Sequence, residues 1–283
     1  MGHYKVSVIM PCFNDGEYIM EAVESLERQT FQDFELIIID DGSDDPGTIQ
    51  TLSLLCEKDN TRVMRTDHIR PAGARNYGID NAVGEYILPL DSDDKIEPTY
   101  IEQAVRVLDA NEEIGVVYCH ADLFGEESGV WELPDYSLDK MLLDNIVFVT
   151  ALFRKDDWAR VGGFRTTMKD GMEDYDFWLS ILEIGKEIYQ LPEILFHYRI
   201  KPKSRTSRFQ ENVAVVQETY QMIYYNHPKL YEKYRDEYAV ILRDALIEQI
   251  FSNRAYRQSL AAFEKMKKIP FIKRVIKKLA LHC

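Results

Sequence analysis

The most constraining feature of this 283-residue sequence is the alternation of short, β-rich apolar runs with longer helical segments through about residue 120. Such alternation is typical of βαβ units, in which parallel strands form a sheet that helices cover. Between the runs, the segment from Glu17 to Gln29 has apolar residues at helical spacing, and Pro98 begins a second helix that extends through Leu108. The predicted strands are Val6 to Met10, Glu35 to Ile39, Thr61 to Arg65, Glu85 to Leu90 and Gly115 to Cys119.

The rest of the chain has a different pattern. From Asp122 to Gln190 it is less regular, with one clear helix that begins near Glu173, and a strand-like stretch follows from Glu193 to Ile200. Beyond residue 200 the chain is rich in Tyr, Arg and Glu, with helical periodicity to its end. We therefore expect an α/β domain over residues 1–200, with a nucleotide-binding half at 1–120 and an acceptor half at 121–200, and a helical region over residues 201–283.

Composition excludes several classes of protein. The net charge of −14 argues against a nucleic-acid partner, because such binding requires a basic surface that neutralises phosphates. No stretch approaches the roughly 20 apolar residues of a membrane-spanning helix. The few residues before the first predicted strand leave no room for a signal peptide, so we expect a cytoplasmic protein. Four scattered cysteines without CxxC spacing fit a reducing compartment and indicate neither a zinc site nor a disulfide framework: Cys12, Cys56, Cys119 and Cys283.

The last twenty residues, 264–283, are basic in an otherwise acidic chain. They contain seven basic residues and one acidic residue, and from Pro270 onward the apolar and basic residues fall on opposite faces of a helix. A basic amphipathic helix could contact an anionic membrane at the inner face of the cell membrane. Its apolar face could equally pack on the protein itself, and the sequence leaves both alternatives open.

Polar residues follow the first two predicted strands. Pro11, Phe13 and Asn14 form the turn after the first strand, and the second strand ends in Asp40-Asp41-Gly42-Ser43. Ligands of open α/β sheets bind beyond the carboxyl ends of neighbouring strands, so these turns should flank one crevice. There Asp41 could accept a hydrogen bond from a base N–H. The alternative is an ordinary turn with Ser43 or Asp44 as a helix N-cap.

The fourth predicted strand ends in Asp91-Ser92-Asp93-Asp94. Carboxylates packed this closely repel one another unless a cation lies among them, and Mn²⁺ or Mg²⁺ prefers oxygen ligands. A surface turn without a metal is the alternative. Arg75, at the start of a predicted helix, could neutralise phosphate or carboxylate charge, although an arginine there is more often solvated.

Six motifs occur in this order: PxFN (11–14), DDGS (40–43), ARNxG (74–78), DxDD (91–94), GGF (162–164) and EDYDFW (173–178). Together, over about residues 5 to 200, they resemble family 2 of the inverting glycosyltransferases, enzymes with the GT-A fold that use nucleotide-activated sugars. The resemblance implies that residues 1–200 form a GT-A catalytic domain, a Rossmann-like α/β fold with a mostly parallel sheet, and that the helical region is a C-terminal appendage.

The resemblance also assigns roles. It implies that Asp174 is the catalytic base and that Asp41 contacts the nucleotide base, usually uracil. Asp91 and Asp93 would serve the ribose and the metal-diphosphate, and a Tyr-Arg pair ending in Arg199 would precede a loop that covers the diphosphate. Glu173 would raise the proton affinity of Asp174 or orient the acceptor, unless these acids only favour the helix N-terminus. The predicted site comprises catalytic Asp174 and Glu173; donor-binding Pro11, Phe13, Asn14, Asp41, Arg75, Asp91, Ser92 and Arg199; and metal-binding Asp93, Asp94 and His197, the histidine being more often structural in such a position.

We expect an inverting, Mn²⁺- or Mg²⁺-dependent transfer of a sugar from a UDP-sugar or another nucleotide sugar to a glycan, polyol-phosphate or lipid-linked acceptor, in cell-surface polysaccharide synthesis. One alternative is a non-catalytic nucleotide-sugar-binding partner subunit. Another is a DxD-type phosphohydrolase, which would need a nucleophilic aspartate where this chain has Pro11-Cys12. Two positions depart from the family pattern on the acceptor side: Ser180 stands where many relatives have an arginine, and Arg165-Thr166-Thr167 replaces the commoner acidic residues after GGF.

Overall fold

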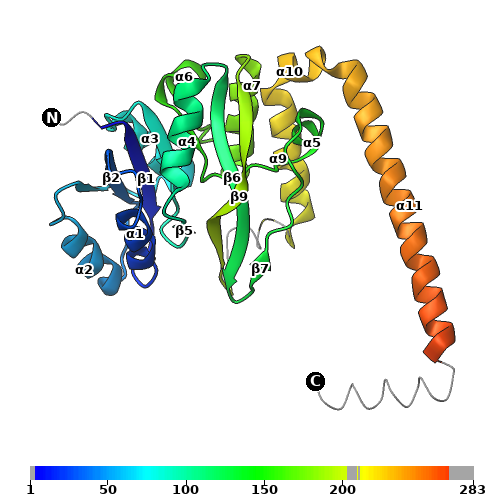
Figure 1. Cartoon of the computed structure of the whole chain (residues 1–283), viewed down its shortest axis with the longest axis horizontal. Coiled ribbons are helices and arrows are strands. Elements are labelled where there is room, and N and C mark those ends of the chain that lie inside the picture. Colours follow the sequence, from blue (N-terminus) through cyan, green and yellow to red (C-terminus); the bar gives the residue numbers. More distant parts are fainter. Residues whose placement is uncertain (1–3, 203–208, 210, 268–283) are drawn as a thin grey trace. The chain divides into compact units, whose positions relative to one another are not determined.

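Parallel strands form the first part of a central sheet (Figure 1). Strand β1 (Val6–Cys12) pairs in parallel with β2 (Phe34–Asp40) on one side and β4 (Tyr86–Pro89) on the other, and β3 (Thr61–Arg65) pairs with β2. Every residue of β2 is buried, and so is nearly all of β1. Such continuous apolar runs require cover on both faces of a sheet, which explains why helices alternate with these strands. The structure describes residues 4–202, 209 and 211–267.

The second part of the sheet is mixed. Strand β8 (Leu152–Arg154) is antiparallel to both β4 and β6 (Ile114–Gly125), and the long β6 runs parallel to β9 (Glu187–Ile200). The strand order is β3-β2-β1-β4-β8-β6-β9-β5. The short strands β5 (Lys95–Ile96) and β7 (Gly129–Val130) pair with β9 and β6, respectively. Because β5 directly follows the Asp91–Asp94 turn, its pairing brings that turn beside the end of β9.

The helices are amphipathic or locally capped. One face of α4 (Tyr100–Ala110) is buried, whereas α2 (Pro46–Leu55) begins at a proline and is capped by Asp45, whose side chain accepts a hydrogen bond from the Thr48 amide. Helix α6 (Lys155–Val161) ends at Gly162 in the left-handed conformation, φ +84°. Among the described residues up to 233, the other helices are α1 (Ile19–Glu27), α3 (Arg70–Asp80), α5 (Leu138–Leu143), α7 (Glu173–Glu183), α9 (Val213–Asn226) and α10 (Pro228–Lys233).

The predicted α/β fold is confirmed, and each predicted strand overlaps an observed one. The strand predicted at 115–119 continues to residue 125, and the strand predicted at 193–200 begins already at residue 187. Strands β5 and β8 were not predicted because two or three residues carry no periodic signal and are held by pairing with distant strands. The helix expected near Glu173 begins at that residue.

The chain forms two compact units, Met1–Lys233 and Tyr234–Cys283. This division falls later than the boundary expected after residue 200. The difference arises because α9 and α10 pack with the first unit: Thr219, Ile223, His227 and Leu230 are buried, and His227 contacts Asp176 of α7.

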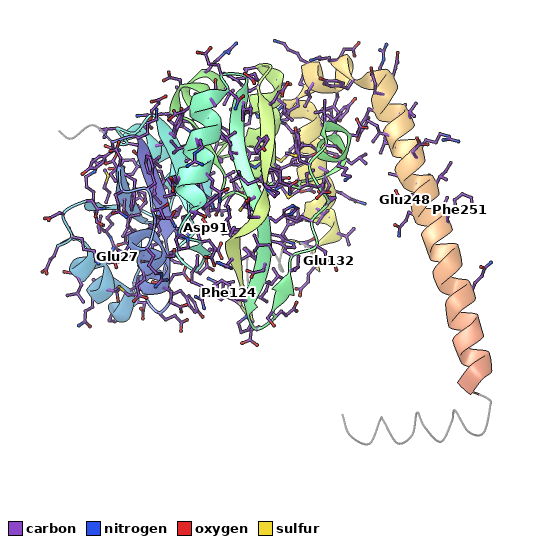
Figure 2. All side chains as sticks on the ribbon, viewed as in Figure 1. Glu27, Asp91, Phe124, Glu132, Glu248 and Phe251 are labelled. Atoms are coloured by element: carbon purple, nitrogen blue, oxygen red, sulfur yellow. The ribbon has the colours of Figure 1, made fainter. Side chains whose placement is uncertain are left out.

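In its described part, the second unit forms one long helix, α11 (Arg235–Lys267). Among the side chains described on α11, the exposed large apolar ones are Val240, Leu242, Leu246, Ile250 and Phe251, the last of which is labelled in Figure 2. Within the described residues, no helix combines the length and the apolar character needed to cross a membrane. The basic tail lies outside the described residues from position 268 onward, so its membrane contact stays a prediction.

Gly78 sets the distance between α3 and the sheet. A Cβ atom at this position would lie 2.6 Å from Cγ2 of Ile9 in β1 and 3.3 Å from Cγ1 of Ile39 in β2. Because α3 also carries Arg75, this close approach fixes the height of the arginine above the sheet.

We expect Gly78→Val to destabilise the first unit by about 2 kcal/mol or more, because overpacking a filled interface costs about 1–3 kcal/mol and valine gains little helix propensity over glycine. Urea unfolding followed by tryptophan fluorescence measures this unit alone, since all three tryptophans (Trp131, Trp158 and Trp178) lie in it. Asp80→Ala, at an exposed position of the same helix, is the control and should change stability by less than about 0.5 kcal/mol. Equal stability of the two variants would contradict the packing argument.

Candidate active site

A buried guanidinium joins three segments of the chain. Arg75 of α3 is 3% exposed, and it donates through Nη2 to Oδ1 of Asp91 at 2.6 Å and through Nη1 to Oε1 of Glu173 at 2.9 Å. Asp91 follows β4 and lies in the middle of the first unit (Figure 2), and Glu173 begins α7. Burial alone would lower the pKa of Arg75, but the charges of Asp91 and Glu173 outweigh it and raise the pKa. Nε of Arg75 has no hydrogen-bond partner within the described part of the chain.

Asp174, next to Glu173, has the environment of a proton acceptor. Met172, the residue before α7, has a left-handed backbone, φ +65°. Asp174 is partly exposed, and its carboxylate accepts hydrogen bonds from the Tyr175 amide at 2.8 Å and from Nδ2 of Asn145 at 3.1 Å. Burial and the charge of Glu173 raise the pKa of Asp174 to about 6, against the lowering effects of these two hydrogen bonds and of Arg75. A carboxylate with this pKa is charged at neutral pH and still basic enough to take a proton.

The Asp91–Asp94 turn is held by the end of β9. Asp94 is 2% exposed and accepts a hydrogen bond from the Arg199 amide at 2.8 Å, while Nε of Arg199 donates to the backbone oxygen of Asp93 at 2.7 Å. Burial, followed by the charges of Asp93 and Asp91, raises the pKa of Asp94 well above its usual range. Oδ2 of Asp93 contacts Nζ of Lys201 at 2.5 Å. Asp94 therefore fixes the backbone of this turn, whereas Asp91 and Asp93 present partly exposed carboxylates.

The loops after β1 and β2 are tied together. Nδ2 of Asn14 donates to Asp44 at 2.7 Å, and Oδ1 of Asn14 accepts from the amides of Asp44 and Asp45. Phe13 is exposed and its ring lies 4.5 Å from that of His68, while Pro11 lies within β1. These contacts place two aromatic rings beside the crevice predicted at the carboxyl ends of β1 and β2.

Asp41 is buried and hydrogen-bonded to the segment that precedes and opens α3. Its carboxylate accepts hydrogen bonds from Oγ1 of Thr66 at 2.7 Å and from the amides of Ile69 at 2.7 Å and Arg70 at 2.8 Å. A carboxylate has about four lone-pair positions, so one position stays for an additional donor. The side chain thus anchors the start of α3 in addition to any contact with a ligand.

The structure does not bring together the three residues predicted to bind a metal. Nδ1 of His197 lies 2.6 Å from Oδ1 of Asp122 and Nε2 lies 2.9 Å from Oε1 of Glu97, so both ring nitrogens face carboxylates other than Asp93 and Asp94. Among the residues described, no three His, Cys, Asp or Glu side chains are arranged to hold a metal ion. Asp91 and Asp93 nevertheless fit Mg²⁺ or Mn²⁺, because such ions are often bound by one or two carboxylates with phosphate oxygens and water completing the shell.

Sequence reasoning missed three residues of this region. Asp15 follows PxFN, and its two carboxylate oxygens contact Lys201 at 3.0 Å and Oγ of the buried Ser92 at 3.1 Å. Asn145, which supports Asp174, lies in a segment with no motif. Lys201 follows the Tyr-Arg pair and belongs to no motif. Each depends on contacts across 29 to 186 positions of sequence, which a single sequence does not reveal.

The two departures from the family pattern lie in contact with each other. Nη1 of Arg165 is 2.6 Å from Oδ2 of Asp176 and 3.2 Å from Oγ of Ser180. Asp176 is fully buried and also accepts a hydrogen bond from Asn226 at 2.7 Å and contacts His227 at 3.2 Å. Burial would raise the pKa of Asp176, but hydrogen bonds from His227, Asn226 and Arg165 outweigh it and lower the pKa. Arg165 thus places a guanidinium directly beside Ser180.

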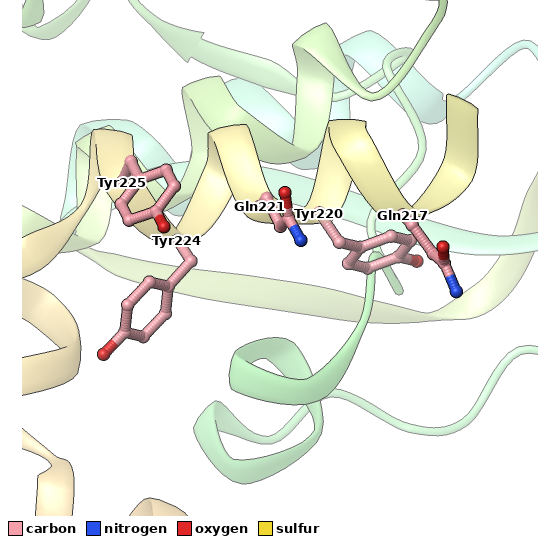
Figure 3. A pocket seen from close by; sticks show the side chains of 5 residues that line it. All are labelled: Gln217, Tyr220, Gln221, Tyr224 and Tyr225. Carbon is pink, nitrogen blue, oxygen red and sulfur yellow. The ribbon is translucent and has the colours of Figure 1, made fainter. Parts of the chain in front are cut away.

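A shallow pocket of about 510 Å³ lies on α9 near the support of Asp174 (Figure 3). The OH group of Tyr220 donates to Oδ1 of Asp144, which also accepts from the Asn145 amide at 2.7 Å. Asn145 in turn donates to Asp174. The pocket therefore connects to the candidate base through two residues; its lining consists of Gln217, Tyr220, Gln221, Tyr224 and Tyr225.

We expect Arg165→Met to destabilise the first unit by about 2–3 kcal/mol at pH 7, because a buried carboxylate loses its charged partner but keeps its other hydrogen bonds. Asp176 has a lowered pKa, so it is charged at pH 7 and the loss is fully felt there; the difference should shrink only as the pH falls through the acidic range where Asp176 gains a proton. Urea unfolding measured by tryptophan fluorescence tests this. Arg160→Met, at an exposed position of α6, serves as the control, and a loss no larger than that of the control would contradict the assignment.

Comparison with known proteins gives a consistent result. The family model described as "Glycosyl transferase family 2" matches residues 7–171. An uncharacterized glycosyltransferase of Rickettsia felis is 44% identical over 108 residues, 38% of this chain and 18% of that protein. The putative glycosyltransferase EpsH of Bacillus subtilis is 28% identical over 253 residues, 82% of this chain and 72% of that protein.

Among solved structures, residues 1–349 of S. aureus TarS in complex with UDP have a TM-score of 0.59 and 25% sequence identity, covering 70% of this chain and 61% of that one. The chain thus spans less than a fifth of the Rickettsia relative and less than two thirds of the TarS fragment. The family model, however, covers more than half of this chain and includes Arg75 and Asp91, whereas the EDYDFW motif begins just beyond its end. This chain therefore belongs to glycosyl transferase family 2 and has a GT-A-like α/β fold.

Proposed function

We propose that this chain transfers a sugar from a UDP-sugar to a hydroxyl of an acceptor with inversion at the anomeric carbon. The observation that carries the proposal is a pair of neighbouring carboxylates with different environments. Glu173 is buried and paired with Arg75, whereas its neighbour Asp174 is partly exposed and has a pKa of about 6. Such a pair gives one fixed charge and one proton acceptor.

Asp174 is the proposed general base. It takes the proton from the acceptor hydroxyl while that oxygen bonds to the anomeric carbon, and the bond from this carbon to the diphosphate oxygen breaks on the opposite side. The products are the glycosylated acceptor, UDP and a protonated Asp174, which then releases its proton to water. Asn145 orients the carboxylate through its hydrogen bond to Oδ2.

The donor half is proposed to lie between Arg75 and the end of β9. The unpartnered Nε of the buried Arg75 and the guanidinium of Arg199 supply positive charge toward a diphosphate. Phe13 and His68 provide aromatic faces for a uracil ring, and Asp41 has room for one more donor. The UDP complex of TarS, a relative in fold and sequence, supports a uridine nucleotide.

Mn²⁺ or Mg²⁺ is proposed to bind at Asp91 and Asp93, where it would neutralise the leaving diphosphate. The acceptor is proposed to be a glycan, a polyol-phosphate or a lipid-linked sugar in polysaccharide synthesis. The neutral amides and tyrosines of the α9 pocket have the chemistry that contacts sugar rings and hydroxyls, which favours a glycan among these classes.

The alternative of a DxD-type phosphohydrolase has little support. Such an enzyme needs a nucleophile at the end of its first strand, where this chain has Pro11 and Cys12. Cys12 is buried, and burial raises the pKa of its thiol to about 12, which suppresses the reactive thiolate. A non-catalytic nucleotide-sugar-binding subunit differs from the proposal only in rate, and the following experiment separates the two.

Asp174→Asn should lower kcat by at least about 100-fold, because general base catalysis contributes roughly 10²–10⁴-fold. The Kd for the donor should stay within a factor of about three, since the amide keeps the shape of the side chain and Asp174 does not contact the proposed diphosphate site. The measurements are UDP release with acceptor and isothermal titration with UDP-sugar. Undiminished turnover would remove Asp174 as the base, and a wild-type chain that binds UDP-sugar without turnover on any acceptor would favour the binding subunit.

The pH profile of kcat should have an acid limb near pH 6. The base must be unprotonated to act, so activity rises with pH through the pKa of Asp174, about 6, and falls about tenfold per pH unit below it. Asn145→Ala removes a hydrogen bond that lowers this pKa, so the limb should move to higher pH. Asn111→Ala, at the end of α4, is the control and should leave the limb in place. A limb that stays or moves down in Asn145→Ala would contradict the role of Asn145.

A further inference from the structure

Lys201 occupies the position of a cation between two carboxylates. Its Nζ atom is 2.5 Å from Oδ2 of Asp93 and 3.0 Å from Oδ1 of Asp15. The three side chains are 22%, 17% and 23% exposed, so this is a partly buried triad and not a surface ion pair. Ser92 also donates to Asp15, which fixes the second carboxylate oxygen.

The triad lies in the most acidic part of the site. Asp91, Asp93 and Asp94 follow one another within four residues, and Asp15 approaches from the loop after β1. The Lys201 ammonium lies between Asp93 and Asp15 and compensates the repulsion among these carboxylates. Arg75 does the same for Asp91 from the other side.

An ammonium and a metal ion cannot both use this position. Mg²⁺ binds carboxylate oxygens at about 2.0–2.1 Å and requires near-octahedral geometry, so an ammonium 2.5 Å from Asp93 blocks that oxygen. Lysine is well suited to leave, because its charge sits at the end of a flexible four-carbon chain. The backbone can stay in place, since Asp94 holds the Arg199 amide two residues earlier.

We propose that Lys201 is an exchangeable internal cation: it holds Asp93 and Asp15 in the donor-free chain, and a divalent ion must displace it from Asp93 to bind. This inference rests on the proposed function only for the identity of the ion that arrives with the diphosphate. Its consequence is that metal binding is weak until a diphosphate offers both the metal and the released ammonium new anionic partners. Lys201 would thereby couple metal binding to donor binding.

The test measures Mn²⁺ binding to the full-length, donor-free protein by electron paramagnetic resonance of free Mn²⁺, without any activity assay. Lys201→Met should bind Mn²⁺ at least about tenfold more tightly than the wild type, because the competing charge is gone. Lys201→Arg retains a cation at this position and should bind as weakly as the wild type. Lys95→Met, which removes a lysine paired with Glu21, controls for the loss of one positive charge nearby.

A second step assigns the carboxylate. Asp93→Asn, added to Lys201→Met, should abolish the gain in Mn²⁺ affinity. Asp15→Asn, added to Lys201→Met, should leave the Mn²⁺ affinity unchanged if Asp15 only anchors the lysine. It should lower the affinity if Asp15 also binds the ion. Lys201→Gln replaces the methionine variant if circular dichroism shows that the latter does not fold.

Equal Mn²⁺ affinity in the wild type, Lys201→Met and Lys95→Met would overturn the proposal, and so would an equal gain in both methionine variants. If Lys201→Met instead lost UDP binding that Mn²⁺ could not restore, Lys201 would be a permanent phosphate contact and not an exchangeable cation. The outcome is separate from the proposed function, because a wild-type chain that transfers no sugar would still give a clear answer in the Mn²⁺ titration.

Discussion

The site depends on the buried guanidinium of Arg75. With 3% exposure it cannot be compensated by water, so its charge must be balanced by protein, and it binds Asp91 and Glu173 at once. Those two carboxylates come from the end of β4 and the start of α7, which are 82 positions apart in the sequence. The same side chain therefore holds the proposed donor side and acceptor side of the site in register, and loss of either carboxylate would leave one nitrogen of the buried guanidinium without its partner.

This arrangement also explains why adjacent acids on α7 behave differently. The Glu173 carboxylate binds the guanidinium, which compensates most of its charge. Asp174 has no such partner among the described residues, and its burial together with the remaining negative charge of Glu173 raises its pKa. Arg75 limits that shift because its positive charge favours the ionised form of Asp174. The pKa of about 6 is thus a balance, high enough for the proposed proton transfer and low enough that the proposed base is ionised at neutral pH.

The sequence predicted the fold and the residues of local motifs well, because apolar periodicity and strand-end turns are local signals. The turns after β1, β2 and β4 are examples. It could not predict which carboxylates are exposed to a ligand and which are buried in structural contacts. Asp94 was predicted to bind a metal like Asp93, but it is buried and accepts a hydrogen bond from the Arg199 amide. His197 was predicted as a third metal ligand, but its ring lies between Glu97 and Asp122. These outcomes depend on how β9 pairs with β5 and β6, a long-range register that periodicity does not specify.

The two cations of the site differ in a way that follows from their chemistry. Arg75 is planar and buried, and it binds its two partners through separate nitrogens. Breaking either contact would therefore leave poorly solvated charge on the arginine and on the carboxylate. Lys201 is a single point charge on a flexible stem, partly exposed, and each of its contacts can be replaced by a metal or by water without leaving a buried charge. A site that keeps its geometry and admits the proposed charged ligand needs one cation of each kind: the arginine maintains the framework, and the lysine compensates the carboxylates proposed to bind the ligand.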